Sequence, residues 1–119
     1  MTHGTRAVVA FVVRAWFAKR SDEVINDMVF DRRIRITGKI DAEGISLFDH
    51  ERGCQISGAG NGENVTLYDH GSYSHLSIHA AGRRFEGYDY ANNSYFGGEW
   101  TADGVLVYDL SEGGSFDYS

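Results

Sequence analysis

The chain has 119 residues, of which 42% are hydrophobic and 24% charged, and its net charge is −6. A chain of this size builds one core, so we assign residues 1–119 to a single domain. The acidic balance excludes the broad basic surface that nucleic acids or anionic membranes require, so neither is expected as a partner. Cys54 is the only cysteine and cannot form a disulfide within the chain, which predicts a reducing, cytoplasmic location.

The first patterned segment is predicted to be a buried helix over residues 5–19. Ala7–Val13 is an apolar run behind Arg6, but Arg14 interrupts it, and it is far shorter than the roughly 20 residues that span a bilayer. The apolar side chains of this helix extend nearly all the way round it, so it must be covered on most sides. Its many valines leave a strand as the alternative. The positions at helical spacing are Val8, Phe11, Val12, Ala15 and Trp16.

A second, shorter helix is predicted after the first. Ser21 is followed by Asp22 and Glu23, which is the composition of a helix N-terminus, and the helix would reach about Met28. The sequence therefore predicts a helical N-terminal segment over residues 5–28.

From residue 33 onward the hydrophobic period changes to two, which is typical of strands. Ile34 and Ile36 alternate with Arg33 and Arg35. A 20-residue repeat then runs to the end of the chain, and a period of this length marks a structural unit. An aromatic-acidic pair recurs at Phe48-Asp49, Tyr68-Asp69, Tyr88-Asp89 and Tyr108-Asp109. A second column follows at Ile56, Leu76, Phe96 and Phe116.

Each repeat is interpreted as two antiparallel strands. If Phe48 faces Ile56, the hairpin loop has three residues, Glu51-Arg52-Gly53, and so does the return connection, Asn61-Gly62-Glu63. We predict an α+β fold in which a strongly curved, possibly barrel-like meander of about nine strands, over residues 33–119, packs on or wraps the helix. A solenoid of parallel rungs is the alternative, although it would stack four aspartates on one another.

This register predicts which residues share a face of the sheet. Even-numbered residues fall on one side and odd-numbered residues on the other. The even side is taken as the core, because it carries an aromatic-aliphatic row. That row reads Ile36, Phe48, Ile56, Tyr68, Leu76, Tyr88, Phe96, Tyr108 and Phe116.

Two side-chain clusters could carry chemistry in this arrangement. On the odd side His75 would lie between Asp69 and Asp89, where the aspartates could act on the imidazole, hold a divalent cation or simply brace their loops. On the even side Cys54 would oppose His50, with His70 on the next strand, as in a nucleophile-base pair or a metal site.

A structural role is the favoured explanation for both clusters, because the aspartates can brace their hairpin loops and the thiol and imidazoles can pack at the rim of the core. A single thiol without a second short-range ligand pair is not typical of a metal site, so we predict neither a metal nor another cofactor. An aromatic cage for a cationic or sugar ligand is the remaining candidate. Its residues would be Tyr68, Tyr88, Tyr90 and Tyr95.

The favoured function is a small, non-enzymatic binding or protein-interaction module that forms a homo-oligomer through its sheet. Both predicted faces carry apolar rows, and one helix cannot shield both. A protein or a small molecule is the expected further partner. The alternative is a small hydrolase or a metal-dependent enzyme that uses the Asp-His-Asp or the Cys-His cluster.

Overall fold

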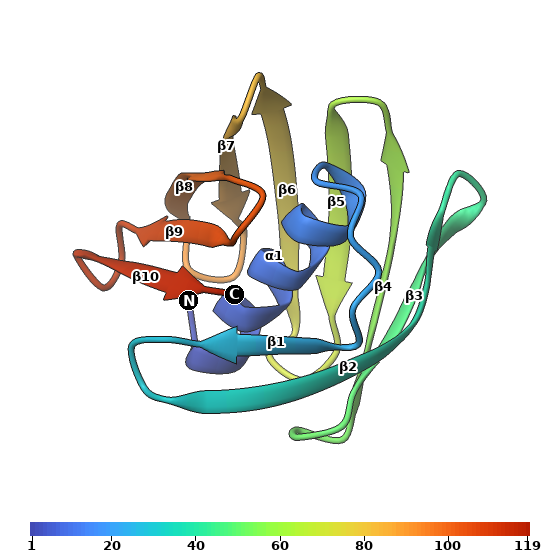
Figure 1. The fold of residues 1–119 in the computed structure, drawn as a ribbon, viewed down its shortest axis with the longest axis horizontal. Coiled ribbons are helices and arrows are strands. Elements are labelled where there is room, and N and C mark those ends of the chain that lie inside the picture. Colours follow the sequence, from blue (N-terminus) through green and yellow to red (C-terminus); the bar gives the residue numbers. More distant parts are fainter.

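The computed structural model describes residues 1–119 as a closed barrel of ten antiparallel strands around one helix (Figure 1). The helix α1 spans His3–Trp16. The strands are β1 Val24–Asp27, β2 Arg32–Asp41, β3 Gly44–Asp49, β4 Cys54–Asn61, β5 Asn64–Asp69, β6 Ser74–Ala81, β7 Arg84–Asp89, β8 Ser94–Trp100, β9 Val105–Asp109 and β10 Gly114–Tyr118. Each strand pairs with its neighbours in sequence, and β10 closes the barrel on β1. The predicted α+β meander is confirmed.

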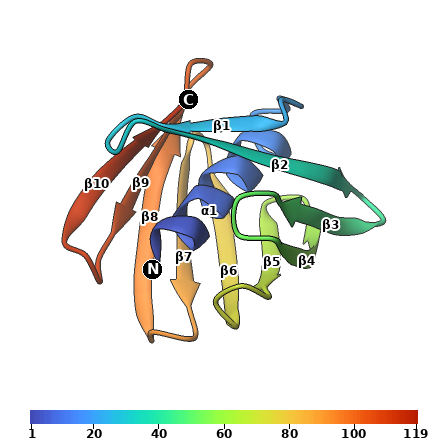
Figure 2. The same cartoon turned by 90° about the horizontal axis from the view of Figure 1, so that it is seen from below.

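The helix α1 fills the inside of the barrel (Figure 2). All ten residues from Thr5 to Arg14 are buried, as the nearly continuous apolar surface of this segment predicted. Thr2 caps the helix, because its hydroxyl accepts the backbone N–H of Thr5 at 3.2 Å. No helix of the chain combines the length and apolar character needed to cross a membrane.

The predicted second helix, up to Met28, is wrong. Residues 24–27 form β1, which pairs with Arg32–Arg35 of β2 and meets β10 at Tyr118. Within β1 the buried Ile25 and Asp27 alternate with partly exposed neighbours, and this period of two is the strand signal. Residues 17–23 form an irregular strap from α1 to β1, and Ser21 caps no helix.

The hairpin register also differs from the prediction. Asp49 pairs with Cys54, so that loop has four residues, and Asn61 pairs with Asn64, so that connection has two. Gly62 has a φ of +60°, which suits the first position of a two-residue hairpin turn. Loops of four and two residues use the same total length as the predicted three and three. The 20-residue period therefore cannot distinguish the two arrangements.

This one-residue change reverses the faces of every second strand. Even-numbered residues point inward from the even-numbered strands, whereas odd-numbered residues point inward from β3, β5, β7 and β9. In the predicted core row the aliphatic members and Phe96 are buried as expected. Phe116 is partly buried and packs against the core. Phe48, Tyr68, Tyr88 and Tyr108 are directed outward, which corrects the prediction for these four aromatic residues.

The barrel contains a fifth copy of the hairpin unit, which begins at Asp27. Ile34 follows Asp27 by the same interval that separates Asp49 from Ile56, and both isoleucines are buried. All five hairpin loops also carry a left-handed residue at their fourth position. Those residues are Asp31, Gly53, Tyr73, Asn93 and Gly113. Five hairpins of one design thus complete the barrel.

Candidate functional site

Five buried aspartates form a ring around the N-terminal end of α1. They stand at the last position of β1, β3, β5, β7 and β9, and each is at most 1% exposed. Their carboxylates accept backbone N–H groups of the loops that follow, as Asp49 does from Glu51 at 3.0 Å and Arg52 at 3.2 Å. The repeated aspartates therefore brace their loops. We name Asp27, Asp49, Asp69, Asp89 and Asp109 the aspartate ring.

Arg52 joins two members of the aspartate ring. Its Nε donates to Asp49 Oδ2 at 2.6 Å, and its two terminal nitrogens donate to Asp69 at 2.9 and 3.2 Å. Burial acts to lower the pKa of Arg52, but the hydrogen bonds with Asp69 and Asp49 outweigh it and raise the pKa. The arginine also packs on Gly4, where a larger side chain would overlap it.

Arg6 reaches the aspartate ring from inside the barrel. It is 1% exposed, donates to Asp109 Oδ2 at 3.0 Å and lies 3.5 Å over the ring of Phe116. The amino group of Met1 lies 3.1 Å from the same oxygen. Burial acts to raise the pKa of Asp109, but hydrogen bonds from Ser111, the Met1 amine and Arg6 lower it overall.

We expect Tyr118 to ionise late in an alkaline titration. Its hydroxyl is buried without a hydrogen-bond partner, and burial raises its pKa from 10.0 to about 12. Because the unfolded chain releases this proton first, the contribution of Tyr118 to stability is complete below pH 10.0 and is lost as the pH rises through about 12. Ultraviolet absorbance should show a phenolate step near pH 12 that is missing from Tyr118→Phe. An unchanged titration curve in that variant would contradict this assignment.

The outer face of the barrel carries a band of aromatic and histidine side chains. Its members take the outward positions next to the aspartate ring, on β3 and β5 to β9 and in the adjoining loops. We name this band the outer aromatic strip. It consists of Phe48, His50, Tyr68, His70, His75, Tyr88, Tyr90, Tyr95 and Tyr108.

The rings of the outer aromatic strip contact one another in clusters. Tyr88 makes edge-to-face contacts with Tyr90 and Tyr95, with centroids 4.8 Å apart in both cases. Tyr68 lies between His70 at 4.6 Å and His75 at 4.5 Å. These contacts hold the rings in fixed orientations although Tyr90 and Tyr95 are 57% and 66% exposed.

Small residues separate neighbouring clusters. Tyr68, Tyr88 and Tyr108 pair across their other strand neighbours with Ser57, Ser77 and Gly97, respectively. One of the resulting recesses has a volume of about 300 Å³ and is lined by residues that include Ser77, Tyr88 and Tyr95. The strip is thus an alternation of projecting rings and gaps.

The predicted Asp-His-Asp cluster is not assembled. His75 is exposed on the outside of the barrel, whereas Asp69 and Asp89 are buried inside it. The change of register moves the histidine and the aspartates to opposite sides of the sheet. No three side chains of histidine, cysteine, aspartate or glutamate converge anywhere in the protein in a way that could hold a metal ion.

The predicted Cys-His cluster is also divided between the two sides of the sheet. On the outer face of the barrel, His50 forms a hydrogen bond with Thr37 Oγ1 at 2.7 Å, and His70 forms one with Ser57 Oγ at 3.1 Å. Cys54 belongs to the inward series of β4, and burial raises the pKa of its thiol, which lowers its reactivity.

All four tyrosines of the predicted ligand cage lie in the outer aromatic strip. The prediction placed Tyr68 and Tyr88 in the core row, which is wrong because both project from the barrel. Phe48 and Tyr108 occupy equivalent positions and were not predicted as site residues. The repeat itself contained the signal that could have found them, since all four aromatic-acidic pairs share one position. No protein-family model, curated protein or solved structure matches this chain.

Proposed function

We propose that the protein is a non-enzymatic protein-interaction module that self-associates through its outer aromatic strip. The observation that carries this proposal is the alternation of exposed ring clusters with small residues along one face. In a two-fold pairing the same surface meets itself, so projections must fit into gaps. The repeat provides both at a regular spacing, and the rings of one copy can enter the gaps of the other.

The charge distribution favours the same surface. No member of the outer aromatic strip is Asp, Glu, Lys or Arg, although the chain carries a net charge of −6. Two copies can therefore approach through the strip without bringing like charges of its members together. Low charge and abundant tyrosine are also the composition of interface centres. Because the strip is small, we expect association in the micromolar range.

Sedimentation velocity tests the proposal. The protein should be dimeric at about 200 µM, and Tyr88→Ser/Tyr95→Ser should be monomeric because it removes the cluster with the most exposed ring. Tyr73→Ser is the matched control, since Tyr73 is 78% exposed on a loop outside the strip and should leave the dimer intact. Circular dichroism checks that both variants fold. A wild-type monomer at about 200 µM, or equal weakening by both variants, would end the proposal.

A further inference from the structure

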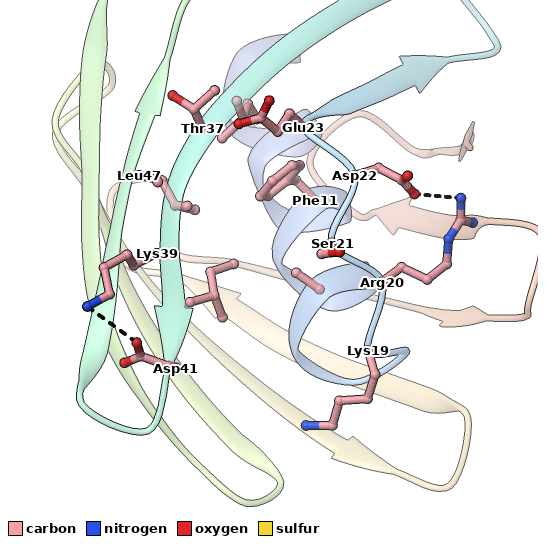
Figure 3. Close-up of a pocket in the computed structure, with 14 residues that line it drawn as sticks. Phe11, Lys19, Arg20, Ser21, Asp22, Glu23, Thr37, Lys39, Asp41 and Leu47 are labelled. Atoms are coloured by element: carbon pink, nitrogen blue, oxygen red, sulfur yellow. Dashed lines mark hydrogen bonds and ion pairs between the residues drawn. The ribbon is translucent and has the colours of Figure 1, made fainter.

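A groove opens beyond the end of β1, between β2 and the strap of residues 17–23. Figure 3 shows the strap and β2 close together at Glu23 and Thr37 and separating toward Lys19 and Asp41. The volume between them is about 450 Å³. We name this feature the β2 groove. It is distinct from the outer aromatic strip, which shares no lining residue with it.

One wall of the β2 groove is a strand edge without a partner. Of the residues of β2, only Arg32–Arg35 pair with β1. The next contact along this edge is a hydrogen bond of 2.9 Å, which the Ile36 N–H donates to the Glu23 carbonyl. Beyond it, residues 37–41 pair with β3 alone. The open edge is thus a direct continuation of the edge that β1 already occupies.

The backbone groups on this edge belong to Gly38 and Ile40. The carbonyl of Arg35 accepts the N–H of His50, which shows that odd-numbered residues of β2 direct their backbone groups to β3. Backbone groups alternate in direction along a strand, so those of Gly38 and Ile40 face the groove. No other backbone group bonds to them from the strap.

The floor of the β2 groove is apolar and its rim is charged. Phe11 from α1 and Leu47 from β3 lie between the strap and β2 (Figure 3). Ile36 and Ile40 of β2 also line the groove. At the rim Arg20 pairs with Asp22 at 2.7 Å and Lys39 with Asp41 at 3.7 Å. The rim is neutral overall, so it selects no strongly charged ligand.

We propose that the β2 groove binds an extended peptide segment of another protein as an added strand on residues 37–41 of β2. Backbone donors and acceptors at strand spacing match another backbone and have no counterpart in an acyl chain. The apolar floor takes alternate side chains of the incoming strand, because these point to one side of it. The occupant is therefore an extended segment with apolar residues at every second position.

Amide NMR of the full chain with defined peptides tests this proposal. The probe is an acetylated, amidated pentapeptide of alternating threonine and valine at about 5 mM, which detects weak pairing. We expect it to shift the amide signals of Gly38 and Ile40 and to slow their hydrogen exchange. Two further versions are N-methylated at alternate backbone nitrogens. The nitrogens methylated in one version face β2, and those methylated in the other face away from it. The version that loses the N–H donors facing β2 should bind about tenfold more weakly than the other.

Each other outcome overturns the proposal. Absence of shifts at about 5 mM, or equal binding of the two methylated versions, excludes strand addition at this edge. Shifts of the same signals by decanoate but by none of the peptides would assign the groove to an apolar acyl ligand. Shifts of Gly38 and Ile40 with protein concentration alone would identify a second copy of the chain as the occupant.

Discussion

Replacing Arg52 with methionine should lower the free energy of unfolding by about 4 kcal/mol, measured by urea denaturation. Arg52 is the cation for both Asp49 and Asp69, which are 1% and 0% exposed. Methionine keeps much of the aliphatic volume but leaves two buried carboxylates without their charged partner. Removing one partner of a buried ion pair is costly because the other charge is left uncompensated.

Arg32 of β2 provides a matched control. It forms an ion pair with Glu51, which precedes Arg52 in the same loop, but the two side chains are 36% and 40% exposed. Water already solvates both charges, so Arg32→Met should change the free energy of unfolding by less than about 0.5 kcal/mol. Equal losses in the Arg52 and Arg32 variants would show that the aspartate ring does not depend on its buried cation.

The second large effect is expected at Arg6. Arg6→Met removes the guanidinium that contacts Asp109 at 3.0 Å and stacks on Phe116. We expect a loss of about 3 kcal/mol, smaller than for Arg52 because the Met1 amine remains beside Asp109. Urea denaturation measures this effect as well.

A double-mutant cycle separates the charge from the packing. Arg6→Met should cost about 1 kcal/mol less in an Asp109→Asn background than in the unchanged protein, because the carboxylate that Arg6 compensates is then absent. If the two substitutions instead add without coupling, the contribution of Arg6 comes from its packing on Phe116 and not from the ion pair.

These effects follow from where α1 lies. The helix occupies the barrel interior and fills it with Val8, Val9, Val12 and Val13, all at 0% exposure. An interior occupied by the chain itself leaves no central cavity for a ligand, unlike open barrels of similar strand number. Binding is therefore proposed for two places on the outside of the barrel. These are the exposed rings of the outer aromatic strip and the unpaired backbone groups on the open edge of β2.

Local chemistry made a large part of the fold predictable from sequence. The valine-rich segment is apolar all round, so a helix formed by it has to be covered on most sides. The 20-residue interval between aromatic-acidic pairs indicates two strands per unit, and glycine or asparagine at loop ends favours hairpins. The first hairpin unit was missed because Asp27 follows Ser21, Asp22 and Glu23, whose composition also suits a helix N-terminus.

The candidate site depended on tertiary structure. Hairpin loops of four and two residues give the same period as loops of three and three, so the sequence cannot tell whether Tyr88 or Asp89 points inward. Closing the barrel around α1 decides it, because the helix provides Arg6, Thr5 and its N-terminal end to satisfy the buried carboxylates. The aromatic half of each pair is then left outside. The sequence by itself determined the repeating unit, and the packing of the helix inside the barrel decided which half of that unit became core and which became surface.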